Sequence, residues 1–307
     1  MMAHDAQTVR GLVARAKYWD QVFVIIGLMS LMVGVLTLAV LLVGLIQDGA
    51  GRLDWSFFSS FPSRRAARAG ILSALVGSSL VMLVTALAAI PLGIAAGVYL
   101  EEYAKRSWIT EIIEINVTNL AGVPSIVYGL LALGLFVYGL GFGQSILSAG
   151  LTLALLILPV IIVATREAIR AIPGSIREGA YALGATRWQT VRDHVVPYST
   201  GGILTGVIIG LARAIGETAP IITIGALTFI AFLPPAPVGG EFPFISFEWL
   251  RSPFTVMPIQ MFNWLSRPQA AFQENAAAAG VVLVALTLLM NGAAIWLRLR
   301  YRKRIKW

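Results

Sequence analysis

The chain has 307 residues, of which 58% are apolar and 12% are charged, where a soluble domain carries about 25% charge, so the composition excludes a water-soluble globule. The absence of cysteine excludes disulfides, thiol nucleophiles and thiolate metal sites, and the presence of only two histidines excludes a histidine-rich metal centre. A net charge of +8 suggests nucleic acid for a soluble protein, but in a membrane protein it reflects loops rich in Lys and Arg.

Charge-free runs of roughly 20 residues or more predict six membrane-spanning helices. In chain order the runs are 21–47, 69–100, 115–165, 195–233 and 275–297, and only Arg213 and Glu217 interrupt the fourth of them. The run 115–165 is too long for one helix, and Gly139-Leu-Gly-Phe-Gly143 predicts a tight hairpin that divides it into two spans. The first run is too long for the apolar part of a signal peptide, so we expect it to remain as an anchor.

The sequence thus predicts an all-α polytopic membrane protein. Sixteen of the 23 Lys and Arg residues fall on one side of these spans and six on the other, which predicts cytoplasmic N- and C-termini. Arg64, Arg65 and Arg68 oppose this bias locally, and we interpret them as an interfacial segment that leads into the second span. We divide the chain into an N-terminal segment with the first helix and an external loop (1–68), a membrane core (69–300) and a basic cytoplasmic tail (301–307).

Pro124 and Ser125 lie within the third span. Proline frees a backbone carbonyl in a membrane helix and serine helps to satisfy it, which predicts a kink or a broken entry. A kink that belongs to a moving gate and a purely structural bend are equally compatible with this pattern.

The loop between the fourth and fifth spans, 172–197, is the most informative cytoplasmic stretch. Pro173-Gly174 ends a helix, and Ser175 with Glu178 predicts a capping box at the start of a short new one. Its small residues allow another surface to pack closely, and Trp188 provides a large anchor. The alternative is an ordinary amphipathic helix on the membrane surface.

The fifth span carries two features. Gly202, Gly206 and Gly210 recur every four residues, which allows another helix to approach closely. Arg213 and Glu217 are also four apart and share a helix face, and counting from the span start places Arg213 roughly 20 Å along the helix. Charges at such depth usually pair and mark a substrate path, and the arginine fork suits a tetrahedral oxyanion. A structural ion pair at a subunit interface is the alternative.

The external segment 234–274 contains Pro234-Pro235, several aromatic residues and few charges. It is expected to lie on the membrane surface. Contact with a substrate-delivering protein and a structural lid are both compatible with this composition.

The loop resembles the coupling motif of ABC importer permeases. Glu178, Ala180, Gly184 and Pro197 match that pattern in register, whereas Gly179, His194 and Val196 depart from it. The resemblance implies a coupling helix that docks on a cytoplasmic ATPase. Its implied contact residues are Arg177, Glu178, Gly179, Ala180, Leu183, Gly184, Ala185, Arg187 and Trp188.

Arg213-Ala-Ile-Gly-Glu-Thr-Ala-Pro220 resembles the signature of phosphate-uptake permeases of the PstA type, and residues 122–129, 254–260 and 263–269 resemble other parts of that family. The resemblance covers residues 70–300 and implies the type I ABC importer permease fold. It places Arg213, Glu217 and Thr218 on the substrate path. We group Pro220 with Pro124, Ser125 and the glycine stripe as packing or gate residues.

The same resemblance implies a transport subunit of the bacterial cytoplasmic membrane, without a cofactor, a metal or catalytic residues. The chain has no Walker P-loop, so ATP hydrolysis would belong to partner subunits. The implied partners are a homologous permease of the PstC type, an ATPase dimer of the PstB type, an external binding protein of the PstS type, phosphate and the lipid bilayer, but no nucleic acid.

Two other transport functions remain open. One is a permease for another oxyanion, such as sulfate or molybdate. The other is an ion-driven secondary transporter, which usually shows an internal inverted repeat that this sequence does not display. A third alternative, a membrane-bound enzyme, is disfavoured because the sequence shows no catalytic cluster of His, Cys and carboxylate residues.

Overall fold

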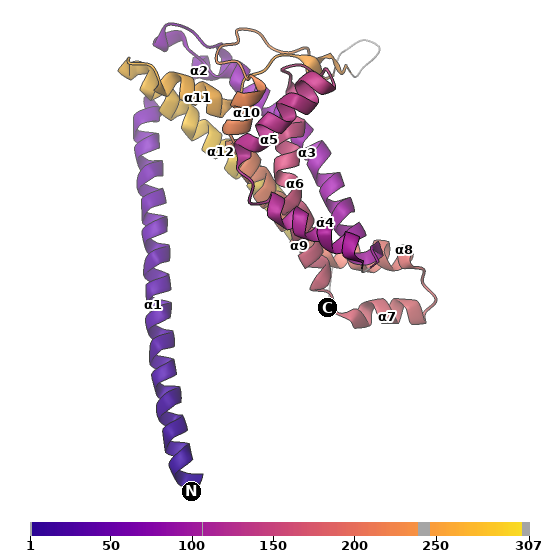
Figure 1. The fold of residues 1–307 in the computed structure, drawn as a ribbon. Coiled ribbons are helices and arrows are strands. Elements are labelled where there is room, and N and C mark those ends of the chain that lie inside the picture. The colour runs from indigo at the N-terminus through magenta and orange to yellow at the C-terminus, as the bar shows by residue number, and fades with distance from the viewer. Residues whose placement is uncertain (1, 106, 239–245, 303–307) are drawn as a thin grey trace.

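The computed structural model describes residues 2–105, 107–238 and 246–302, and its elements are helices joined by turns (Figure 1). Five helices in this part of the chain are long and apolar enough to cross a membrane, and a sixth span results if one bent pair counts as a single crossing. The structure therefore confirms an all-α protein with five or six candidate spans. The basic tail predicted at 301–307 lies almost entirely outside the described residues.

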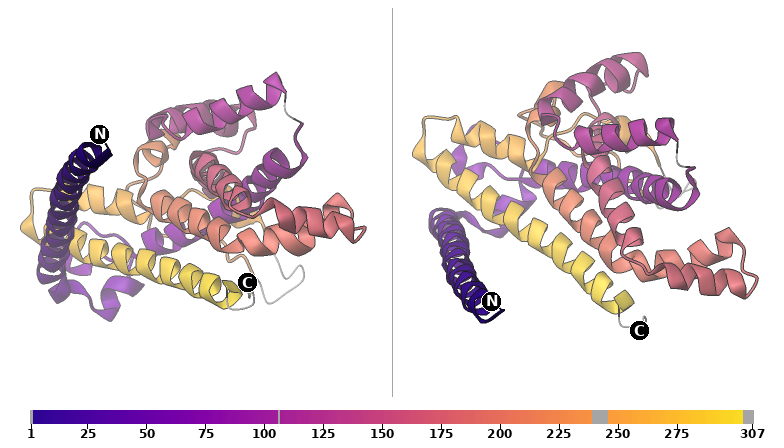
Figure 2. Two further views of the ribbon diagram at one scale, coloured as in Figure 1. Left: turned by 90° about the horizontal axis from the view of Figure 1, so that it is seen from below. Right: turned by 60° about the horizontal axis from the view of Figure 1, so that its bottom comes forward.

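The first helix, α1 (Met2–Gly49), is apolar on all sides within its span, and none of that span is buried. A helix that is hydrophobic all round requires lipid or another apolar surface around it. Figures 1 and 2 show α1 running beside the bundle, which it approaches at its C-terminal end. There Gly49 lies so close to Ala277 and Ala278 of α12 (Ala270–Arg302) that a side chain could not fit.

A short outer segment connects α1 to the bundle. It contains η1 (Ala50–Arg52), α2 (Trp55–Ser59) and η2 (Ala66–Arg68), and Asp54 caps α2 by accepting the Phe57 N–H. The arginines 64, 65 and 68 are exposed here, immediately before α3 (Leu72–Val98) begins. The expected lead-in to the second span is thus an exposed turn at Arg64 and Arg65 followed by the short 3-10 helix that contains Arg68.

The core of the bundle consists of α3, α6 (Ile146–Arg170) and α9 (Val196–Gly216), with α6 packed against both of the others. Small residues make this packing close: a Cβ atom on Gly150 would lie 2.5 Å from Val84 Cβ. Close approach of this kind stabilises helix association where no water is available to drive it. A π-helical turn, η3 (Tyr99–Tyr103), ends α3.

The third predicted span is broken into two helices. These are α4 (Trp108–Leu120) and α5 (Ser125–Ala132), and α5 continues as the π-helical η4 (Leu133–Gly139). The two parts are bent by 109°. Pro124 causes the break, because its backbone is extended (φ −55°, ψ 135°) and it precedes the first turn of α5. The hairpin predicted after this span is confirmed, with Gly141 and Gly143 at φ +67° and +70°.

The fifth span differs from its sequence prediction at both ends. The helical run starts at α8 (Arg187–Thr190), continues through η5 (Val191–Val195) into α9, and ends at Gly216 instead of residue 233. Pro197 therefore lies in the first turn of α9 and does not end a loop. A short helix, α10 (Ala219–Ile224), follows and stops at Gly225, which adopts φ +98°.

The external segment predicted at 234–274 is partly helical. It contains η6 (Glu248–Arg251) and α11 (Met257–Leu265), and α12 already begins at Ala270; residues 239–245 lie outside the described ranges. In Figure 1, α2 and α11 lie at one end of the bundle, and the helix that follows α6, α7 (Gly174–Ala182), lies at the opposite end, toward which the starts of α1 and α9 also point.

Candidate coupling surface and substrate path

The helix α7 forms between two backbone signals. Pro173 precedes its first turn, and Gly184 ends it in the left-handed region at φ +82°, where its N–H bonds to Tyr181 O at 2.9 Å. The capping box predicted at Ser175 and Glu178 is wrong, since no side chain caps this helix. A capping box occurs instead at the start of α8, between Thr186 and Gln189.

The segment from α7 to α8 projects from the bundle and exposes large apolar side chains (Figure 1). Leu183 is 90% exposed and Trp188 is 62% exposed, at the two ends of the turn that joins the helices. Glu178, Gly179, Gly184 and Arg187 are exposed as well, whereas Ala180 is buried and Ala185 is half-buried. This surface offers an apolar, charge-rimmed patch to a partner.

Arg177 lies on the opposite, inner side of α7. Its guanidinium bonds to Glu102 of η3, with Nη2 2.7 Å from Oε1, and donates to the carbonyls of Ile169 and Ile172, each at 3.1 Å. These carbonyls belong to the end of α6, where helical partners run out. Arg177 therefore fixes α7 to the bundle and does not face outward with the other predicted contact residues.

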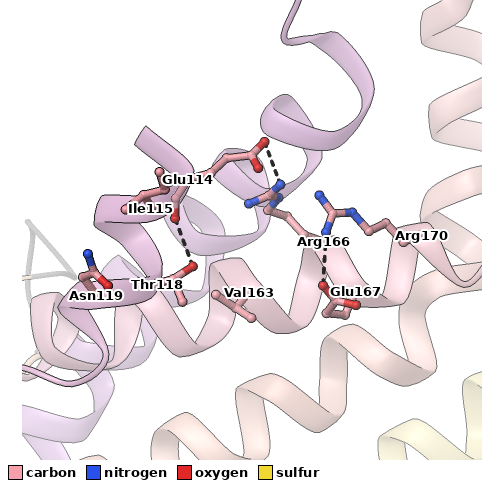
Figure 3. Close-up of a pocket in the computed structure, with 8 residues that line it drawn as sticks. All are labelled: Glu114, Ile115, Thr118, Asn119, Val163, Arg166, Glu167 and Arg170. Atoms are coloured by element: carbon pink, nitrogen blue, oxygen red, sulfur yellow. Dashed lines mark hydrogen bonds and ion pairs between the residues drawn. The ribbon is translucent and has the colours of Figure 1, made fainter. Parts of the chain in front are cut away.

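A network of ion pairs lies beside this attachment, and Figure 3 shows most of its members around a cavity of about 360 Å³. Arg166 of α6 lies 3.3 Å from Glu101 of η3 and 2.7 Å from Glu114 of α4. Arg170 bonds to the other oxygen of Glu101 at 2.9 Å and also pairs with Glu167. The sequence prediction missed this network, although these residues flank the charge-free runs that defined the spans.

The proposed substrate-path pair lies at the end of a helix. Arg213 is in the last turn of α9, and its Nε lies 3.1 Å from Oε1 of Glu217, the extended residue that follows the helix. The prediction that the helix continues past this pair is wrong, because α9 stops at Gly216. Arg213 lies roughly 39 Å along the helical run when the count starts at Arg187. A cation there is favoured by the helix dipole.

The two side chains of this pair are not equally exposed. The Arg213 side chain is 37% exposed and that of Glu217 is 18% exposed. Glu217 lines a small internal cavity with Ser78 of α3, whereas Thr218 lines a separate cavity of about 540 Å³ beside α11 and α12. Arg213 is thus accessible from the subunit surface while Glu217 holds it from within.

The start of α10 packs tightly against α5. A Cβ atom on Gly129 would overlap Thr223 Oγ1 and lie 2.7 Å from Pro220 Cα, so the two helices touch through their backbones. Pro220 is buried, Ser125 is half-buried and Pro124 is exposed. The structure thereby brings the bend in the third span next to the break that carries the charged pair.

The glycine stripe of α9 packs within the subunit. Cβ atoms on Gly202 and Gly206 would overlap those of Ala168 and Ala164 on α6, whereas Gly210 faces Ile157 and Ile161 at ordinary contact distance. The stripe therefore serves the α6–α9 contact of the core.

Comparisons with known proteins agree on one family. The sequence profile described as "binding-protein-dependent transport system inner membrane component" matches residues 89–306. The chain is 32% identical to the probable ABC transporter permease protein YqgI of Bacillus subtilis over 87% of this chain and 92% of that protein. It is 35% identical to the phosphate transport system permease protein PstA of Mycobacterium leprae, over 79% of this chain and 76% of that protein.

A third relative, PstA of Yersinia pestis, is 30% identical over 88% of this chain and 86% of its own length. Among solved structures, a chain of the MetNI methionine ABC transporter in an inward-facing conformation has the same fold. Its TM-score is 0.57 at 17% identity, over 75% of this chain and 97% of that chain.

Proposed function

The chain belongs to the family of binding-protein-dependent transport system inner membrane components, and we propose that it is the permease subunit of an ATP-driven phosphate importer. As a family member it is a multi-pass inner membrane protein, and it works with a separate ATPase subunit and a substrate-binding protein. A binding-protein-dependent system leaves no place for the ion-driven secondary transporter considered above.

The observation that carries the phosphate assignment is the Arg213–Glu217 pair at the break between α9 and α10. A guanidinium offers two parallel N–H donors to phosphate oxygens, and Arg213 is accessible from the subunit surface while its Nε is held by Glu217. Two of the relatives that span most of the chain are named as phosphate permeases. We assign Thr218, which directly precedes α10 and lines the cavity beside α11 and α12, to the same proposed path.

We further propose the finer assignments that follow from this function. The partners are a homologous permease of the PstC type, an ATPase dimer of the PstB type and a binding protein of the PstS type. The fold is that of a type I importer, with six crossings, cytoplasmic termini and a permease core at 69–300. In this fold the bent pair of helices on either side of Pro124 counts as one of the six crossings. The exposed ridge of α7 and α8, with Leu183 and Trp188, is the ATPase contact.

The mechanism is alternating access between the two permeases. ATP binding closes the ATPase dimer, pushes on α7 and opens the outer side of the complex to the binding protein. Arg213 and its counterpart on the partner permease then attract phosphate at the subunit interface. Hydrolysis and release return the complex to the inward-facing state.

The test replaces Arg213 by Gln in proteoliposomes that contain the partner subunits. A hydrogen bond to a charged group is worth about 1.5–3 kcal/mol, so phosphate uptake should fall by about 10- to 150-fold. Arg192→Gln is the matched control. Arg192 lies on the same helical run and is well exposed, and its one ion pair within the described residues is with its neighbour Asp193. Undiminished uptake by R213Q would remove Arg213 from the path, and inhibition of uptake by excess sulfate would assign a broader oxyanion substrate.

A further inference from the structure

The helix α4 lies on the outside of the subunit, against α6. It has no buried residue, and its outward face carries exposed apolar side chains such as Trp108 and Ile112. Two polar contacts fix it: Glu114 pairs with Arg166 at 2.7 Å, and the Leu120 carbonyl accepts a hydrogen bond of 2.7 Å from the Tyr128 hydroxyl. The position of α4 relative to α6 therefore depends strongly on the Glu114–Arg166 pair.

Arg166 is the branch point of the ion-pair network. Its side chain is 7% exposed, and its guanidinium reaches Glu101 with Nε and Glu114 with Nη2. Glu101 and Glu102 are adjacent in the π-helical turn η3, and Glu102 holds Arg177 of α7. Two sets of ion pairs, joined by the backbone of η3, therefore link α7 to α4: Arg177 with Glu102 on one side, and Glu101 with Arg166 and Glu114 on the other. Figure 3 shows Glu114 of α4 and Arg166 of α6 pointing toward each other.

Beyond α4 the contact continues to the proposed substrate path. The break between α4 and α5, with Gly122 and Pro124, provides backbone that can act as a hinge. The middle of α5 then touches the start of α10, where Gly129 meets Pro220, three residues after Glu217. A change in the angle of α4 is thus connected to the position of the charged pair.

We propose that Arg166 is the positioning residue that couples α7 to α4, so that the bent pair α4–α5 moves with the coupling helix. The inference rests on the proposed role of α7 as the ATPase contact. It assigns to Glu101, Glu102 and Glu114 the task of keeping α3, α6, α7 and α4 moving as one unit. Packing alone does not provide this link to α4, because none of its residues is buried.

The test removes the Glu114 carboxylate and leaves Arg166 its partner Glu101. Removing Arg166 itself would leave Glu114 without its partner, would leave Glu101 with Arg170 alone, and would empty a site on α6 that is only 7% exposed, so its effect would mix folding with coupling. Glu111→Ala is the matched control: Glu111 lies one turn earlier on α4, is exposed, and has no ion pair within the described part of the chain. Glu114→Gln is a second variant that keeps the shape of the side chain, should Glu114→Ala fail to assemble.

The reporter is a single cysteine at position 119, an exposed site on α4 of a chain that has no native cysteine. Its maleimide modification rate is measured in the complete complex without nucleotide and with ATP and vanadate. In the reporter background and in E111A, nucleotide should change this rate by about threefold or more. In E114A the change should disappear while ATP hydrolysis continues.

Two results overturn the inference: a nucleotide effect in E114A as large as in E111A, or no nucleotide effect at all in an active reporter complex. Phosphate uptake by the same vesicles is measured separately. If the reporter complex takes up no phosphate, but its labelling rate responds to nucleotide and this response is lost in E114A, the phosphate assignment is wrong and the role of Arg166 stands. If the reporter complex takes up phosphate normally and labelling in E114A still responds to nucleotide, the phosphate assignment stands and the role of Arg166 is wrong.

Discussion

Replacing Gly129 by Ala tests whether the contact between α5 and α10 positions the charged pair. The new Cβ would lie 2.7 Å from Pro220 Cα and 2.9 Å from Pro220 O, and it would also overlap Thr223 Oγ1. Ordinary carbon contacts lie at about 3.5–4.0 Å, so α10 has to move by about 1 Å. Overpacking of this kind costs about 1–3 kcal/mol. Two of the atoms that have to move, Pro220 Cα and Pro220 O, belong to the backbone and cannot be displaced by a side-chain rotation.

Gly134→Ala is the matched control, because Gly134 lies in η4 of the same span and has no heavy atom within 4 Å of its Cβ position. Both variants gain similarly from the loss of backbone freedom, so their difference isolates the contact with α10. We expect a lower melting temperature of the purified complex for G129A than for G134A. Phosphate uptake in proteoliposomes should be lower by at least about fivefold, since 1–3 kcal/mol corresponds to that order of change.

The melting temperature and phosphate uptake together show whether the contact between α5 and α10 stabilises the subunit, positions the charged pair, or does both. Equal melting temperatures and equal uptake for G129A and G134A would show that the contact is not limiting. A lower melting temperature with undiminished uptake would show that the contact stabilises the subunit but does not position Arg213 and Glu217.

Two further predictions concern the α7–α8 segment. Gly184→Ala forces a side chain into a backbone at φ +82°, which costs about 1–3 kcal/mol. We expect less ATPase to co-purify with this variant than with Gly174→Ala, a control in α7 whose Cβ position is open and which is not one of the predicted contact residues. Equal recovery would refute the need for this turn. Leu183→Ser removes a side chain that is 90% exposed. It should leave the stability of the isolated permease unchanged but weaken ATPase co-purification, and a loss of permease stability would contradict the docking role.

Hydropathy was sufficient to predict most of the spans and the hairpin at residues 139–143. It could not find the end of α9, because the chain remains apolar well beyond Gly216 and a sliding count of charges has no reason to stop there. A local signal was present: a proline lacks the N–H for the i→i−4 hydrogen bond and its ring clashes with the carbonyl four residues earlier, which for Pro220 is that of Gly216. The charged pair was thus identified correctly as a pair but assigned to the wrong part of the helix.

The ion-pair network could not be predicted for a different reason. Glu101, Glu114 and Arg166 each mark the end of a charge-free run, so the sequence shows them as separate boundaries. Which boundary charges meet depends on how the helices are stacked, and the bend of 109° between α4 and α5 brings Glu114 to Arg166. Tertiary placement of this kind leaves no local pattern.

The interruptions of the helices explain why the candidate sites lie where they do. Backbone that leaves a helix within a bilayer must find partners in protein or in a water-lined space, because lipid provides none. The interruption before α5 and the one before α10 each have a proline at the start of the new helix, and the middle of α5 packs on the start of α10 through Gly129 and Pro220. Arg213, in the last turn of the helix before α10, keeps a side chain that is 37% exposed. The proposed substrate path lies at this point, so we expect a change in the bend of α4–α5 to act on it through the contact between Gly129 and Pro220.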